Sequence, residues 1–239
     1  MDQIEVRQAL SLILDRDAIA QAVYRGTATP SLTPVQPGAW GYSTDLWQAA
    51  YDALPKPEYN VEKASELIAD AGLDGTELSI ALPADSEAEQ KIAEMLVAGG
   101  NQIGLTITTE TIPQTSFTEL YFDDQARAPY DAFIVQEYGA GVADPNVTMS
   151  EFTPLSAYNY GNNDDPVLTQ SLEDAYAAMD ETERAEALIT GQESMVENLA
   201  LINVVNLEQR MFQNSRITGA SASLSRLYYP WAAKIGAAE

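Results

Sequence analysis

A strand followed by a glycine-containing loop is the clearest candidate for binding chemistry in this chain. The apolar run 132–135 predicts a buried strand, which leads into the polar and aromatic residues Glu137 and Tyr138. Gly139 and Gly141 come next, and glycine permits positive φ values and the close approach of a ligand to the backbone. Because α/β proteins tend to hold ligands at the carboxyl ends of their strands, we expect this loop to line a cleft.

The same loop also has a simpler interpretation. Asp144 and Pro145 have the residue types found at the N-cap and at the first position of a helix. The segment would then be an ordinary strand-to-helix connection. Both interpretations stay open, with Asp144 as a candidate ligand-binding residue in the first and as a helix cap in the second.

The remaining motifs give little support to catalysis. Residues 139–144 lack the third glycine of a dinucleotide-binding fingerprint, because Asp144 occupies its place. Residues 219–223 lack the second glycine of a nucleophile elbow, and the chain has no His to serve as the base. The acidic segment 162–165 lacks calcium-loop spacing and is typical of a turn and helix cap. We expect no catalytic residues and no cofactor. A carboxylate-dependent glycoside hydrolase remains an alternative, because among 36 acidic residues some pair will lie at a distance suitable for glycoside hydrolysis. A non-transport ligand sensor is a second alternative.

Composition narrows the class of partner. The chain has 239 residues, 46% of them hydrophobic, which is enough for a full core, and we expect one domain over 1–239. Its 36 acidic and 12 basic residues give a formal charge of −24. Nucleic acid is therefore excluded as an expected partner, because Lys and Arg must neutralise its phosphates. The acidity is typical of a solvated surface, with adaptation to high salt as a second interpretation.

Cys and His are both absent, so disulfides, thiolate chemistry and imidazole ligands are excluded, and we expect no metal site. The sequence shows neither a signal peptide nor an apolar run long enough to cross a membrane.

Helical and strand patterns alternate in a way that predicts an α/β sheet. Strands are expected at 76–82, 105–111 and 132–135, with later strands at 201–205 and 210–212. Predicted helix starts carry Asp15, Asn60 and Asp180 as caps, and Ser86 with Glu89 and Ser116 with Glu119 as capping boxes. The Pro-rich segment 27–57 is predicted to be mainly a long ordered loop, with a short helix near 46–53. Trp40 and Tyr42 lie in this loop and not on the apolar face of a predicted helix.

Several segments together resemble one family. They run in family order across nearly the whole chain: 6–24 (VRQALSLILDRDAIAQAVY), 30–42 (PSLTPVQPGAWGY), 59–72 (YNVEKASELIADAG), 130–145 and 158–172. They are similar to family 5 extracellular solute-binding proteins, the peptide- and oligopeptide-binding components of ABC importers.

The resemblance implies a fold, a function and a location. The fold would be one lobe of a periplasmic-binding-protein-like (type II) α/β fold, with a central mixed sheet flanked by helices. The chain would be the C-terminal lobe of a two-lobed protein, binding a peptide or other small oligomeric solute between its lobes. Its partners would be the missing N-terminal lobe and the ABC transporter permease, and we expect a monomer. The protein would be extracellular or periplasmic, held at the membrane as a lipoprotein by an N-terminal anchor outside this sequence.

The chain departs from the family's dipeptide binders at two places. Gly141 stands where those proteins hold the peptide ammonium with an aspartate, although Glu137 is a candidate replacement. Residues 82–89, which include Asp85, contain no arginine for the peptide carboxylate. A desolvated charge without its counter-charge costs several kcal/mol, so longer peptides or oligosaccharides are favoured over free dipeptides. The candidate ligand-binding residues are Trp40, Tyr42, Asp85, Glu137, Tyr138, Gly139, Gly141 and Asp144.

Overall fold

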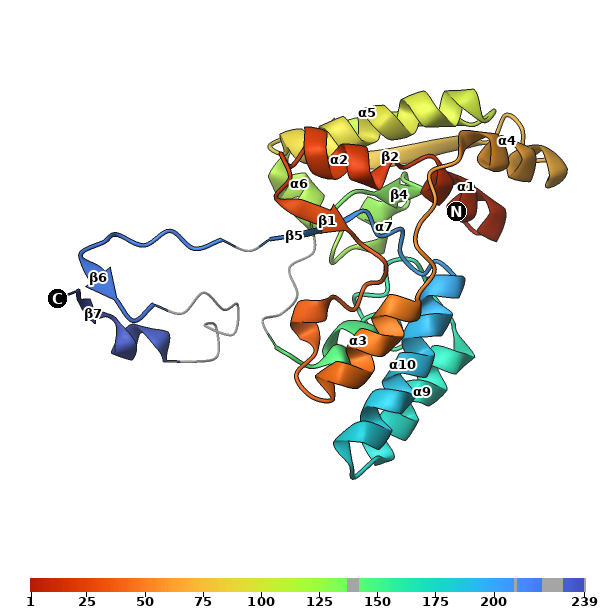
Figure 1. Cartoon of the computed structure of the whole chain (residues 1–239). Coiled ribbons are helices and arrows are strands. Elements are labelled where there is room, and N and C mark those ends of the chain that lie inside the picture. Colours follow the sequence, from red (N-terminus) through yellow and green to blue (C-terminus); the bar gives the residue numbers. More distant parts are fainter. Residues whose placement is uncertain (137–141, 209, 221–229, 239) are drawn as a thin grey trace.

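Three parallel strands form the centre of what we call the α/β half, the upper part of the molecule in Figure 1. The structure is a computed structural model that describes residues 1–136, 142–208, 210–220 and 230–238. The strands are β2 (Glu77–Pro83), β3 (Thr106–Ile112) and β4 (Ala132–Phe133), and their order in the sheet is β3-β2-β4. Leu78 lies opposite Ile107, and Ala81 lies opposite Phe133. The strand–helix–strand order predicted for residues 76–135 is confirmed.

Helices cover this sheet and complete its core. The α/β half contains α1 (Ile4–Leu12), α2 (Arg16–Ala22), α4 (Val61–Asp70), α5 (Glu87–Gln102), α6 (Gln114–Glu119) and α7 (Asp124–Arg127). Its main core is built from Val, Ala, Leu and Ile, with Ile19, Ile68, Ile103 and Leu105 among the most deeply buried side chains. Branched aliphatic side chains of this kind suit a sheet that is covered by helices.

Some predicted caps are confirmed and others are wrong. Asp15 accepts a hydrogen bond from the Ala18 backbone N–H at 2.9 Å, and Asn60 accepts one from the Lys63 N–H at 2.9 Å. Ser86 occupies the N-cap of α5, but its side chain makes no capping hydrogen bond. Ser116 lies inside α6, which begins two residues earlier at Gln114. The Ser116 prediction fails because the residue types do not fix where the first turn begins, and the Ser86 prediction fails because the side chain makes no bond to a turn that does begin there.

Among the described residues, the helical half, the lower part of Figure 1, contains α3 (Thr44–Ala53), α8 (Pro145–Ser150), α9 (Pro166–Ala177) and α10 (Glu181–Glu197). Helices α9 and α10 lie side by side. They approach closely at Gly191, where an added Cβ would lie 2.1 Å from the Ser171 hydroxyl oxygen. The core of this half includes Trp40, Trp47, Met149, Leu168 and Leu188.

A separate two-stranded ribbon joins distant parts of the chain. In it β1 (Ala28–Pro30) pairs antiparallel with β5 (Val205–Leu207). The α/β class is therefore confirmed. The described strands of the central sheet pair only in parallel, and β1 pairs with β5 outside that sheet. The 27–57 segment contains β1, a 3₁₀ turn (Pro37–Ala39) and the predicted helix. The strand predicted at 201–205 lies later in the chain, as β5 at Val205–Leu207, and the strand prediction for 210–212 is wrong.

Beyond β5 the chain leaves the body. We call residues 210–220 and 230–238 the C-terminal arm, which Figure 1 shows extending away from both halves. In it β6 (Ile217–Thr218) pairs antiparallel with β7 (Gly236–Ala237), after the 3₁₀ turn Trp231–Lys234. Across the described ranges, no helix combines the length and apolar character needed to cross a membrane.

Candidate ligand-binding site

The carboxyl ends of the parallel strands bring two of the predicted segments to one edge of the sheet. Strand β2 ends at Pro83, just before the exposed Asp85, and β4 ends at Phe133, just before the glycine-containing loop. Parallel pairing places both ends on the same side. Glu137, Tyr138, Gly139 and Gly141 lie outside the described residues, so their roles stay predictions.

Two candidates from distant segments lie together beside this loop. Tyr42 lies close enough to Asp144 for the carboxylate to affect its hydroxyl. The backbones also approach closely, because a Cβ added at Gly41 would lie 1.8 Å from the Ala143 carbonyl oxygen. Only glycine at position 41 allows the 40–42 segment to approach the start of α8 in this way. The structure therefore joins the Pro-rich segment to the loop after β4.

The Tyr42 hydroxyl remains protonated over the physiological pH range. Burial raises its pKa to about 12, the neighbouring Asp144 carboxylate adds to the rise, and Arg184 opposes it. The Arg184 guanidinium carbon lies 5.9 Å from the centre of the Tyr42 ring. The Nε of Arg184 is buried and has no hydrogen-bond partner among the residues that are described. This small group therefore holds an aromatic face, a hydroxyl donor and a cation.

Asp144 also performs the structural role predicted by the simpler interpretation. Its carboxylate accepts a hydrogen bond from the Asn146 backbone N–H at 3.1 Å, and Pro145 occupies the first turn of α8. The prediction of a strand-to-helix connection capped by Asp144 is thus confirmed. A ligand-binding role for the same carboxylate stays a prediction.

Trp40 is largely buried in the core of the helical half. Only 9% of its surface is exposed, and it stacks on Trp47 with ring centres 6.3 Å apart. Tyr51 contacts Trp40 edge to face at 5.6 Å. This packing fixes the chain just before Gly41 and Tyr42, while direct contact between Trp40 and a ligand stays a prediction.

A second aromatic cluster lies where β4 ends, and sequence reasoning missed it. Phe133 packs against Phe117 and Tyr160 with ring centres 5.9 and 5.6 Å apart. The Arg127 guanidinium lies 5.2 Å from the centre of the Tyr160 ring. Tyr160 follows Tyr158 at a spacing of two within a glycine- and asparagine-containing loop, a signal that could have identified it. Arg184 carried no such signal, because it lies on an ordinary amphipathic helix.

The side chains of these two clusters are of kinds that bind ligands. Within the described ranges no group of three or more acidic side chains could hold a metal ion. The sequence also has no His or Cys to act as base or nucleophile. Aromatic faces, a hydroxyl and a few charged groups are the side chains that ligand-binding pockets usually present.

The fold and the site together define one lobe of a ligand-binding α/β protein, and comparisons give its family. Residues 1–160 match the model of the bacterial extracellular solute-binding proteins, family 5 (middle). The match covers more than half of the sequence, so the chain belongs to the family 5 solute-binding proteins, and the resemblance found in the sequence is confirmed.

Individual relatives agree with this assignment. The dipeptide-binding protein of Escherichia coli is 32% identical over 110 residues, covering 44% of this chain and 19% of that protein. The peptide transport periplasmic protein SapA of Haemophilus influenzae is 25% identical over 240 residues, covering 94% of this chain and 40% of that protein. The chain thus spans less than half the length of these relatives.

A solved structure confirms the fold. The oligopeptide-binding protein AppA of Bacillus subtilis, in complex with a nonapeptide, superposes with a TM-score of 0.76 at 18% identity. The match covers 99% of this chain and 48% of that one. The predicted lobe of a periplasmic-binding-protein-like fold is therefore confirmed.

Proposed function

We propose that this chain is the C-terminal lobe of the substrate-binding component of an ABC importer. It would bind a peptide or another small oligomeric solute between itself and an N-terminal lobe, and deliver it to the permease. The main support is the grouping of Tyr42, Asp144 and Arg184 where α8 begins, after the loop that follows β4. The peptide named in the AppA complex, and the peptide-related names of the two relatives, favour this class of ligand.

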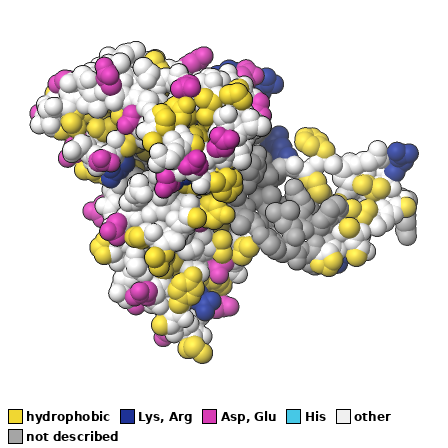
Figure 2. Space-filling view, turned by 180° about the vertical axis from the view of Figure 1, so that it is seen from behind, with side chains coloured by type: hydrophobic (Ala, Val, Ile, Leu, Met, Phe, Trp, Pro, Cys, Tyr) yellow, Lys and Arg dark blue, Asp and Glu magenta, His cyan; other side chains and the backbone are white. Residues whose placement is uncertain are grey.

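The C-terminal arm supports a missing partner lobe. Its apolar side chains are exposed, with 94% of Phe212, 38% of Met211 and 37% of Ile217 accessible to solvent. Figure 2 shows hydrophobic side chains along the arm, away from the body. Exposed apolar surface of this extent usually marks an interface. An N-terminal lobe packed on the arm would cover these side chains and provide the second wall of the cleft.

Closure of the two lobes would trap the ligand by hinge motion, with no covalent chemistry. The protein would therefore not be an enzyme, and it would act as a monomer. Members of this family are extracellular solute-binding proteins. We place the whole protein outside the cytoplasmic membrane, held there by an N-terminal lipid anchor.

We infer that the ligand is not a free dipeptide held at both termini. The segment after β2 offers Asp85, Glu87 and Glu89 and no cation for a carboxylate. Charge-assisted hydrogen bonds are the strong contacts in such sites, and a desolvated carboxylate facing acids would lack one. Longer peptides held through their backbone, or oligosaccharides stacked on aromatic rings, fit the edge better.

The test is calorimetry with a two-lobed protein that contains this chain, using dipeptides, longer peptides and oligosaccharides. We expect the longer ligands to bind best, and the 239-residue chain alone to bind them about a hundredfold more weakly, a loss of about 2.7 kcal/mol. Tyr42→Phe should weaken binding, while Tyr59→Phe, which alters a tyrosine that is 53% exposed in the α/β half, should leave it unchanged. Equal affinity in both proteins, or turnover of a ligand, would contradict the proposal.

A further inference from the structure

A polar cavity of about 190 Å³ lies where the α/β half meets the helical half. Its lining shares no residue with the group formed by Tyr42, Asp144 and Arg184. The polar side chains that line it come from α1, α2, the segments on either side of α3, the end of α10 and the chain leading into β5: Gln8, Ser11, Arg16, Ser31, Lys56, Glu197 and Asn203.

Arg16 is the buried charge of this cavity. Only 6% of its surface is exposed, and no ion pair to it occurs within the described ranges. Its Nε donates to the Asn203 carbonyl oxygen at 2.8 Å, and Nη1 donates to the carbonyl oxygens of Ser11 at 2.9 Å and Leu14 at 3.4 Å. Its Nη2 donates to the Ser11 hydroxyl oxygen at 2.9 Å. Because a guanidinium has five N–H donors, one N–H of Nη2 remains for another acceptor.

The positive charge of Arg16 is held without a carboxylate to balance it. Burial lowers its pKa to about 10, which still leaves the guanidinium charged at neutral pH. Backbone carbonyl oxygens satisfy its hydrogen bonds but carry no net charge. A buried cation in this condition gains from an anion that reaches it.

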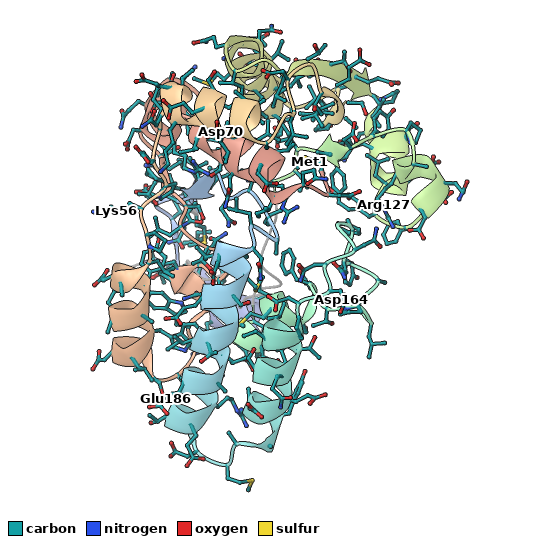
Figure 3. The ribbon with its side chains drawn as sticks, turned by 90° about the vertical axis from the view of Figure 1, so that its right-hand side faces the viewer. Met1, Lys56, Asp70, Arg127, Asp164 and Glu186 are labelled. Carbon is teal, nitrogen blue, oxygen red and sulfur yellow. The ribbon has the colours of Figure 1, made fainter. Side chains whose placement is uncertain are left out.

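Other donors face the same space. Lys56 is exposed at the rim and makes no ion pair or side-chain hydrogen bond to any described residue, and Figure 3 shows it between the two halves. The Ser11 hydroxyl accepts from Arg16 and keeps its own proton for donation. The side-chain amide of Gln8 adds a further donor. Glu197 is the acid among the lining residues, so two cations face one carboxylate.

We propose that this cavity is a binding site for a small singly charged oxyanion, of which a carboxylate is the best example. One negative charge would balance the excess of two cations over one acid. The oxygens would receive N–H from Arg16, N–H from Lys56 and the hydroxyl of Ser11. A local positive site of this kind is unusual in a chain whose formal charge is −24.

Occupancy would tie the two halves together. Arg16 begins α2, whereas Asn203 precedes β5, which pairs with β1 and leads to the C-terminal arm. Lys56 lies in the connection from α3 of the helical half to α4 of the α/β half. An anion bridging Lys56 and Arg16 would therefore stabilise the junction, by binding the folded state and not the unfolded one.

The test is thermal denaturation of the 239-residue chain in sodium formate, acetate, phosphate and chloride at one ionic strength. We expect formate and acetate to raise Tm saturably above the chloride value. The exposed Lys56→Gln should weaken this effect at least tenfold. Lys91→Gln, which removes an exposed lysine paired with Glu87 at 2.6 Å, should leave the anion effect unchanged.

Amide resonances then locate the anion. Acetate should shift the signals of Ser11, Lys56 and Asn203 and leave those of Tyr42 and Asp144 in place. The proposal is overturned if acetate shifts the amide signals of other residues instead, or if Lys56→Gln keeps the full rise in Tm. It is also overturned if formate and acetate raise Tm no more than chloride does. A larger response to phosphate than to carboxylates would overturn the assignment of a singly charged ligand.

Discussion

The two halves of the molecule treat a buried carboxylate in opposite ways. In the helical half, Asp165 is 6% exposed and accepts from the backbone N–H groups of Val167 and Leu168, from the Ser194 hydroxyl and from the Asn198 amide. In the α/β half, Glu89 is 5% exposed, and its Oε2 has no hydrogen-bond partner among the described residues.

Asp165 is a fully hydrogen-bonded acid, whereas Glu89 keeps one oxygen without a partner among the described residues. Asp165 caps α9 and connects it to α10, so its charge stabilises the helical half. Glu89 lies in the first turn of α5, close to Tyr24 and Asp85, at the edge where the parallel strands end. The α/β half therefore keeps a buried acid with an unsatisfied oxygen at the edge where its parallel strands end.

The main core of the α/β half is aliphatic, whereas the core of the helical half contains Trp40 and Trp47. Of the substitutions proposed here, Trp47→Ala should cause the largest loss of stability. Trp47 is fully buried and stacks on Trp40, so truncation should cost about 3–5 kcal/mol of unfolding free energy. Urea denaturation measures the loss. Trp47→Phe should lose much less, and a loss below 1 kcal/mol for alanine would mean that the helical half can collapse around the gap.

Asp165→Ala should cost about 2–3 kcal/mol at pH 7, because it removes a helix cap and leaves Ser194 and Asn198 without their acceptor. Burial works to raise the pKa of Asp165, but hydrogen bonds from Ser194, Leu168, Asn198 and Val167 lower it overall.

A lowered folded-state pKa stabilises the protein above the unfolded-state value near 4 and stops doing so as pH falls through the folded value. The gap between wild type and Asp165→Ala should therefore narrow in acid. Denaturation curves at pH 7 and pH 3 check this. A stability difference between wild type and Asp165→Ala that is the same at both pH values would show that the charge of Asp165 contributes nothing to stability.

Glu89→Gln should give the smallest effect and the opposite sign, a gain of about 1 kcal/mol at pH 7. Burial raises the pKa of Glu89, its own backbone N–H opposes the rise, and Asp85 adds to it. A raised folded-state pKa of an acid means that the charged form destabilises the protein above that pKa. The gain should therefore begin to shrink as pH falls through the folded value and should vanish below the unfolded-state value near 4.

Lys91 is the main cause of the lowered pKa of the neighbouring Glu87, and Arg25 adds a smaller lowering, so Arg25 is the nearby cation to test for Glu89. Arg25→Gln provides the control, because it should leave the stabilisation by Glu89→Gln unchanged. A larger gain from Glu89→Gln in that background would mean that Arg25 stabilises the charged form of Glu89.

The sequence by itself determined the local structure of this protein. Asp15, Asn60, Asp144 and Asp180 cap the helices that their residue types predicted, because a cap depends on neighbours two or three residues away. The strands β2 and β3 follow from their apolar patterns, and the order of segments identified the family. The prediction for Ser86 failed because its side chain makes no bond to the first turn of α5.

Only the tertiary structure decided which of these segments share a site. Tyr42, Asp144 and Arg184 come from three separate elements, and no local pattern places an arginine of α10 over a tyrosine of the Pro-rich segment. The cavity around Arg16 depends likewise on the return of the chain at Asn203. Local preferences act over a few residues, whereas burial, charge pairing and close approach at Gly41 arise only when distant segments pack together.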